Sequence, residues 1–381
     1  MSFTNDDTIK NLENIIPKYI NNQSVPKDIL VIIDKYIPKL NDKNIHQVVK
    51  YYRSNYTIQK QQVIKMYGPI SDWNVSIVTN MEKLFYNSTH FNGDISDWNV
   101  SNVLSMADMF DSASAFNQSL NKWNVSNVQY MNGMFKNTWE FNQPLNNWDV
   151  SNVTDMNYMF YQAKSFNQPI NKWNVSSVTI MEGMFEYAES FNQSINNWDV
   201  SNVTTMKDMF KFALLFNCNI RKWNVSNVTT MYNMFLNASS FNQSLNNWNV
   251  SKVKNMNYMF SWAESFNQPL YNWNVSNVTD ISSIFEGAWE FNQPLNKWNV
   301  SNVQYMNGIF KNTWEFNQPL NNWDVSNVTD MNYMFYQAKS FNQPLNNWNV
   351  SNVRYMSSMF ESAASFNQPL KMQPGIFIIY K

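Results

Sequence analysis

The sequence has little cysteine, histidine or glycine, with one, two and seven of them in 381 residues. A single thiol, Cys218, excludes an internal disulfide framework, and no Cys or His spacing is typical of a zinc site. The N-terminal residues do not show the pattern of a signal peptide, and no apolar run has the length of a membrane span. We therefore expect no metal, no cofactor and no membrane-spanning segment.

The sequence also lacks an excess of charge of one sign. It has 27 basic and 28 acidic residues, so its net charge of −1 provides no long-range attraction to nucleic acid or to an anionic membrane. Residues 1–68 carry ten basic and six acidic residues, a local excess of +4 that a solvated helical segment also produces. We expect a monomer that binds neither nucleic acid nor membrane.

A 25-residue repeat organises most of the chain. Trp recurs at a constant interval of 25, twelve times from Trp73 to Trp348. Val follows each Trp after two and five residues, Phe after 12, and Phe-Asn after 18. An array without insertions is typical of stacked turns and not of a globular domain. We number the turns 1 to 12 by their Trp, and column +n denotes the residues n places after it.

The spacing within turn 4 predicts three segments. Trp148 and Val150 alternate with polar residues, which is typical of a short strand with both side chains inward. Apolar residues at intervals of three, four and seven predict a helix of about two turns over 156–163. An extended return begins at Phe166. Because one turn cannot bury its apolar side alone, neighbouring turns are expected to stack, with Asn167 bonding backbone groups of its own and the next turn.

One repeat unit carries a family resemblance. The string "FNQPLNNWDVSNVTDMNYMF" at 141–160 recurs unchanged at 316–335 and resembles the repeat of the BspA-like leucine-rich-repeat family, the Mycoplasma-type 25-residue repeat of unknown function. The resemblance covers about residues 69–370. It implies an α/β fold, a right-handed leucine-rich-repeat-like solenoid of twelve turns with a short parallel strand and a short helix in each, and a role in binding.

The family resemblance and the codon usage implied by the composition bear on the source organism and the cellular compartment. The family occurs in bacteria, protists and giant viruses, and the chain's 24 Lys against 3 Arg indicate an AT-rich genome. A giant-virus member is therefore among the sources we consider. We expect a cytoplasmic protein, which would be in the host cytoplasm if the source is viral.

The ends of the chain do not follow the repeat. Residues 1–68 are predicted to form a helical N-terminal cap, residues 69–370 the solenoid, and residues 371–381 a C-terminal capping tail that contains "GIFIIYK". The cap would cover the apolar end of turn 1, which solenoids need. The alternative is an independent partner-binding module. The cap helices are expected near 7–20, 26–39, 43–54 and 57–67.

The sequence offers no set of different reactive groups that could converge on one site, as catalysis requires. His46 and His90 have no partner that the sequence identifies. Asp149, Asp199 and Asp324 replace Asn in one column, and isolated carboxylates do not make an acid–base pair. We expect a protein that is not an enzyme, without catalytic, cofactor-binding or metal-binding residues.

Any specific function of a repeat protein lies where its repeats differ. The variable columns surround the invariant Phe of the expected helix, and several carry aromatic residues outside the ladders. Exposed Trp and Tyr anchor protein interfaces, whereas the alternative is that these rings fold over the adjacent turn. The predicted partner-binding residues are Trp139, Trp262, Trp289, Trp314, Tyr158, Tyr258 and Tyr333.

These residues lead to a prediction of function with one alternative. We expect a protein–protein interaction scaffold with an unknown partner, and the alternative is a glycan-binding or surface adhesion protein. Residues 120–169 and 295–344 differ only at Met134 and Ile309, which indicates recent copying of two whole turns. Trp139 and Trp314 therefore count as one piece of sequence evidence.

Overall fold

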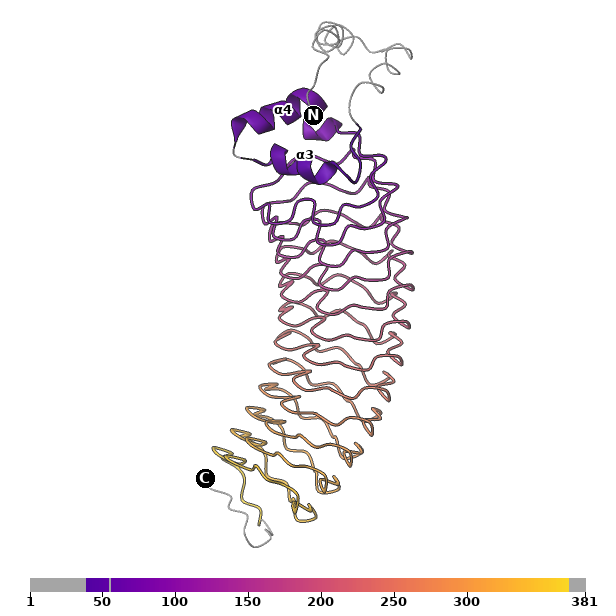
Figure 1. Cartoon of the computed structure of the whole chain (residues 1–381). Helices are drawn as coiled ribbons and strands as arrows, with labels where there is room; N and C mark the ends of the chain where they lie inside the picture. The colour runs from indigo at the N-terminus through magenta and orange to yellow at the C-terminus, as the bar shows by residue number, and fades with distance from the viewer. Residues whose placement is uncertain (1–38, 55, 370–381) are drawn as a thin grey trace, which may run out of the picture.

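The computed structural model describes residues 39–54 and 56–369. Two helices, α3 (Ile45–Tyr52) and α4 (Thr57–Tyr67), precede a short 3-10 helix, η1 (Ile70–Asp72). The turns then stack into a long, curved array that runs from α3 and α4 to the C-terminal end (Figure 1). The helices expected near 43–54 and 57–67 are thus found. The helix expected near 7–20, all but the last residue of the one expected near 26–39, and the tail at 371–381 lie outside the described residues.

Adjacent turns are paired in parallel, as a solenoid requires. A single parallel bridge joins each turn to the next at column +7, from Asn80 with Ser105 to Asp330 with Tyr355. The strand predicted at Trp148–Val150 is not formed, because the Val150 carbonyl accepts the N–H of Val153 within the same turn, at 3.0 Å. The inward direction of the Trp148 and Val150 side chains is confirmed, since they are 3% and 1% exposed.

The prediction of a short helix in each turn is wrong. The segment 156–163 is buried on the predicted side but forms consecutive β-turns, with Tyr158 and Gln162 in the left-handed region at φ 52° and 54°. In an α-helix the N–H of Phe160 would bond four residues back, whereas here it donates to the carbonyl of Met184 in the next turn, at 2.9 Å.

Turn spacing explains why no helix forms. Helices packed side by side need about 8–10 Å between their axes. The rings of Phe160 and Phe185 in adjacent turns are stacked with centroids 5.6 Å apart, close to the ~4.8 Å spacing of paired strands. A chain that must keep this spacing on every side of the turn can accommodate backbone pairing and β-turns there, but not helices.

Equivalent residues form continuous ladders inside the array. The indole rings of Trp173 and Trp198 are parallel, with centroids 6.3 Å apart and an interplanar angle of 2°. Trp173 Nε1 donates to the Leu145 carbonyl of the preceding turn at 3.0 Å, so the indole polar group is satisfied without solvent. The expectation for Asn167 is confirmed toward the next turn: its Oδ1 accepts the backbone N–H of Asn192 at 3.0 Å.

Residues before the repeats contact the open side of turn 1. In later turns the column +6 N–H bonds to the previous turn, as Thr154 does to Gln129 at 3.0 Å. Turn 1 has no previous turn, and Asp42 Oδ1 instead accepts the N–H of Thr79 at 2.8 Å. Tyr52 of α3 packs edge-on against Trp73 at 5.3 Å. These contacts satisfy a backbone donor and cover the first ring of the Trp ladder.

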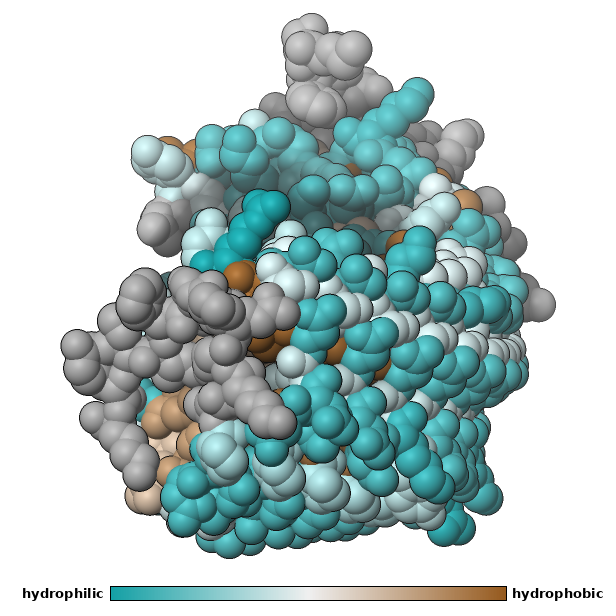
Figure 2. All heavy atoms as spheres, turned by 90° about the horizontal axis from the view of Figure 1, so that it is seen from below, coloured by the Kyte–Doolittle hydropathy of each residue, from teal (hydrophilic) through white to brown (hydrophobic). Residues whose placement is uncertain are grey.

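The last turn is more open than those before it. Trp348 and Val350 are 8% and 9% exposed, against 3% and 1% for Trp148 and Val150. Viewed from the C-terminal end, hydrophilic residues cover most of the visible surface of the array, with hydrophobic residues showing between them (Figure 2). Within the described residues no helix has the length and apolar character needed to cross a bilayer.

Candidate interaction surface

The outer surface of the β-turn segment is built by side chains in the left-handed columns, +10 and +14. Tyr158 and Trp262 occupy these columns, and each ring lies over the equivalent residue of the next turn. Those residues are Gly183 and Gly287. A β-carbon on Gly183 would collide with the Tyr158 ring, and one on Gly287 would lie 2.6 Å from Trp262 Cδ2. Tyr158 and Trp262 therefore cover the neighbouring turn where it has a glycine, whereas Tyr187 stacks on Phe212, the large residue of the next turn in the same column, at 4.5 Å.

The predicted partner-binding residues differ widely in exposure. Trp139 is 50% exposed and Tyr333 is 44% exposed. The other five, Trp262, Trp289, Trp314, Tyr158 and Tyr258, are only partly exposed. The expected alternative, folding over the adjacent turn, thus describes Tyr158 and Trp262, while Trp139 and Tyr333 present much of their side chains to solvent.

Three of the tryptophans form one line along turns 8 to 10. Trp262 meets Trp289 edge-on, with centroids 6.4 Å apart, and Trp289 stacks on Trp314 at 4.9 Å. Lys339 Nζ lies 3.7 Å from the centroid of the Trp314 ring, on the side of the following turn. Trp314 Nε1 is buried and has no hydrogen-bond partner among the described residues. These rings mainly contact one another, so they offer less free surface than Trp139.

The tyrosines are also held by neighbours, to different extents. The Tyr158 hydroxyl donates to Glu182 Oε1 at 2.8 Å, and burial together with this bond raises the pKa of Tyr158. Tyr258 meets Tyr232 edge-on at 6.4 Å. Tyr333 has Lys311 Nζ 5.8 Å from its ring centroid and remains 44% exposed.

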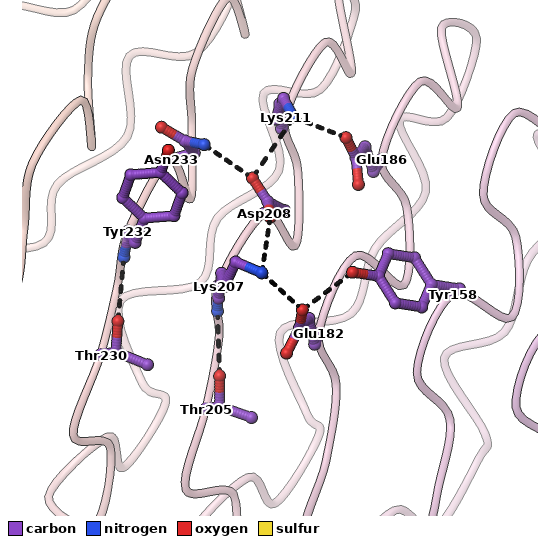
Figure 3. A network of polar contacts seen from close by, with 10 residues as sticks. All are labelled: Tyr158, Glu182, Glu186, Thr205, Lys207, Asp208, Lys211, Thr230, Tyr232 and Asn233. Carbon is purple, nitrogen blue, oxygen red and sulfur yellow. Dashed lines mark hydrogen bonds and ion pairs between the residues drawn. The ribbon is translucent and has the colours of Figure 1, made fainter.

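A charged network that the sequence analysis missed lies beside Tyr158 (Figure 3). Lys207 pairs with Glu182 at 2.8 Å, and Lys211 pairs with Glu186 at 2.8 Å, each across one turn boundary. Asp208 lies between them, 3.6 Å from Lys207 Nζ and 3.5 Å from Lys211 Nζ. Burial raises the pKa of Glu186 although the Lys211 ammonium opposes the shift. The network links turns 5 and 6.

Each carboxylate in this network has a cationic partner. Asn233 extends the network into turn 7, its Nδ2 donating to Asp208 Oδ1 at 2.9 Å. The sequence did contain a signal for these contacts, because Glu182 and Lys207, like Glu186 and Lys211, are 25 residues apart. Opposite charges at the repeat interval face each other across adjacent turns.

The described residues include no group of three or more His, Cys, Asp or Glu side chains that could hold a metal ion. Burial raises the pKa of the Cys218 thiol to about 11, so it is protonated at neutral pH and is a weak nucleophile. His46 and His90 are both exposed, one in α3 and the other in turn 1.

Comparison with known proteins identifies the family to which the repeat is similar. The family model described as "Mycoplasma protein of unknown function, DUF285" matches residues 54–171, 136–236, 165–272, 212–314 and 282–373. A comparison with curated proteins gave no match. A solved structure described as "Crystal structure of TLR13-ssRNA13 complex" aligns at 10% identity and a TM-score of 0.23, over 71% of this chain and 52% of that one. This chain spans about half the length of that protein.

Proposed function

The chain belongs to the DUF285 family of Mycoplasma-type repeat proteins, and we propose that its solenoid is a non-catalytic scaffold for protein–protein interaction. The ladders make a rigid, extended support, because each turn is bonded to the next through backbone and side chains. We also propose that the coil is right-handed, as parallel crossover connections almost always are. Individual side chains on this support would then determine which partner binds.

The observation that supports this proposal most strongly is the exposure of the Trp139 side chain. Its side chain is 50% exposed, and none of the ring or cation contacts found among the described residues involves it. Removing a Trp from water is among the largest contributions that one residue makes to a protein interface. An exposed Trp on a rigid support therefore favours a protein partner with an apolar pocket. Tyr333 is a second exposed aromatic residue, although Lys311 and Tyr336 contact its ring.

Affinity purification with matched variants of the full chain tests this proposal. The wild-type protein, Trp139→Ala and Trp314→Ala would each be used as bait, and the recovered proteins compared quantitatively by mass spectrometry. We expect proteins that the wild type and Trp314→Ala recover equally and that Trp139→Ala recovers at least about tenfold less, as expected for loss of a hot-spot residue. Equal recovery by all three baits would exclude Trp139 as the anchor.

A further inference from the structure

A polar groove crosses the last three turns, away from the column of Trp139. It has a volume of about 520 Å³. Its walls come mainly from columns +4 and +6, and they contain amides, hydroxyls and one guanidinium, with little apolar surface. The lining residues are Asn302, Gln304, Asn327, Thr329, Ser351, Asn352, Val353 and Arg354.

The amides in this groove have a fixed orientation. Nδ2 of Asn302, Asn327 and Asn352 each donates to a Ser carbonyl of the preceding turn, at 2.7, 2.7 and 2.6 Å. Each side chain is exposed. This bond uses one of the two N–H groups of each Nδ2, so each amide offers a ligand its Oδ1 as an acceptor and its second N–H as a donor. Successive turns therefore present three amides in a row in the same orientation, about 4.8 Å apart if they follow the strand spacing.

The groove contains one cation, and two exposed tyrosines are next to its lining residues in the chain. Arg354 is exposed, and no carboxylate pairs with its guanidinium among the residues that the structure describes. Tyr305 and Tyr355 directly follow Gln304 and Arg354 in the chain, and they are 46% and 58% exposed. Exposed tyrosine rings can lie against the apolar face of a flat ligand while their hydroxyls remain in water.

We propose that this groove binds an acidic oligosaccharide. Sugar hydroxyls would donate to the row of Asn Oδ1 atoms, whose separation is close to the length of one sugar ring. A carboxylate of the sugar would pair with Arg354, and one sugar face would lie on Tyr305 or Tyr355. A protein partner fits less well, because the core of a protein interface is apolar and this groove is not.

The first copy of the duplicated segment provides matched controls. Tyr130 is the counterpart of Tyr305 within an identical stretch of sequence and is 47% exposed. In the turn that follows that copy, Ser177 and Thr179 take the places of Asn352 and Arg354. Lys254 is an exposed cation in column +6 that lies outside the groove. Variants at Tyr130 and Lys254 thus change a tyrosine and a cation in the columns of Tyr305 and Arg354 without changing the groove.

Isothermal titration calorimetry of the full chain with a galacturonic acid hexamer tests the proposal, with maltohexaose as the neutral probe. We expect the acidic hexamer to bind at least about tenfold more tightly than the neutral one, since hydrogen bonds to charged groups are the stronger ones. Arg354→Gln should weaken its binding at least about tenfold and Tyr305→Ala several-fold. Tyr130→Ala and Lys254→Gln should bind as the wild type does.

Three results would overturn the proposal. They are no binding of the acidic hexamer, equal affinity for the two hexamers, and an affinity that Arg354→Gln leaves unchanged. All four substitutions are at exposed positions, and melting curves would confirm that each variant keeps the fold. The scaffold proposal is tested separately, because Trp139 lies in another column and is unchanged in these variants.

Discussion

Residues 120–169 and 295–344 have the same sequence except at Met134 and Ile309, yet their surfaces differ. Trp139 in the first copy is 50% exposed, whereas Trp314 in the second is largely covered. The neighbouring turns are responsible. Trp314 lies between Trp289 and Lys339, but the residue before Trp139 in column +16 is Ser114, which is too small to cover an indole ring.

The residues that follow the two tryptophans in the column are both lysines, and they behave differently. Lys164 pairs with Glu189 of the next turn at 3.0 Å, which draws it away from Trp139. Lys339 has Ala364 in that place and lies over Trp314 instead. An outward residue is therefore specified by the residues 25 places before and after it, and identical turns acquire different surfaces from different neighbours.

The largest effect should be the same in both copies, because the inner ladders do not differ between them. Trp148→Ala and Trp323→Ala should each lower the free energy of unfolding by about 3–5 kcal/mol, since each leaves a cavity in the ladder. Each also leaves a carbonyl without its indole donor, at Leu120 and Leu295. Denaturant unfolding measures the loss, and hydrogen exchange should show neighbouring turns opening too. If only one of the two substitutions lowers the free energy of unfolding, the stability of the Trp ladder also depends on the residues of the neighbouring turns.

A smaller effect should separate the copies at Tyr158 and Tyr333. Tyr158 lies over Gly183 and bonds Glu182, whereas Tyr333 is followed 25 residues later by Ser358 and is more exposed. Gly183→Ser would place a side chain at φ +56° under the Tyr158 ring, so we expect a loss of about 1–3 kcal/mol on thermal or denaturant unfolding.

The reverse change is the control for that substitution. Ser358→Gly relieves a left-handed Ser at φ 55° and should alter the free energy of unfolding by less than about 1 kcal/mol. If Gly183→Ser is as well tolerated as Ser358→Gly, the ring of Tyr158 does not depend on the glycine beneath it.

The inner half of each turn could be predicted from the sequence, and the outer half could not. Trp148 and Phe160 are buried, and their recurrence in every turn predicts this. Each of them packs against the same residue type in the turns before and after it. The helix expected over 156–163 failed because apolar spacing alone does not distinguish a helix from β-turns that place the same residues inward. The narrow spacing between stacked turns excludes the helix and favours β-turns, and this spacing is not visible in the sequence of a single turn.

The candidate surface was predicted only in part for a related reason. The different exposure of Trp139 and Trp314 cannot be predicted from their own turns, which differ only at Met134 and Ile309. Signals at the repeat interval do exist: opposite charges 25 residues apart, as in Lys311 and Glu286 at 2.8 Å, and an aromatic residue followed by Gly, as in Trp262 and Gly287. Comparing each turn with the next along its columns would have located these contacts.

Two single substitutions should change the exposure of Trp314 and Trp139 in opposite directions, with little change in the free energy of unfolding. Ala364→Glu gives Lys339 a carboxylate partner and should uncover Trp314, while Glu189→Ala should free Lys164 to lie over Trp139. Acrylamide quenching of Trp fluorescence should increase in the first variant and decrease in the second. Exposed ion pairs and cation–π contacts contribute little, so the free energy of unfolding should change by less than about 1 kcal/mol.

Ala364→Gln is the control for these variants, because it adds a side chain of similar size without charge. It should leave the quenching of Trp fluorescence as in the wild type. Quenching that increases equally for Ala364→Gln and Ala364→Glu would show that side-chain bulk, and not ion pairing, moves Lys339.

The smallest effect concerns Asp149 and Asp324, the same residue in the two copies. Hydrogen bonds from the Ser151 and Ser326 hydroxyl and backbone groups lower the pKa of the respective Asp. A carboxyl with a lowered pKa in the folded state stabilises that state above the pKa of the unfolded chain, near ~3.9, and loses this contribution as the pH falls through the folded-state pKa. Asp149→Asn and Asp324→Asn should therefore melt slightly below the wild type at pH 6, and the difference should shrink as the pH falls below about 4.

The contact from Ser to Asp lies within one turn, with the Ser N–H 3.1 Å from Asp Oδ1 in both copies. The two variants should therefore give the same pH profile of melting temperature, unlike the exposed aromatics in column +16. If the pH profiles of Asp149→Asn and Asp324→Asn differ, neighbouring turns influence even hydrogen bonds that lie within one turn. The contacts within a turn would then depend on the neighbouring turns, as the exposure of Trp139 and Trp314 does.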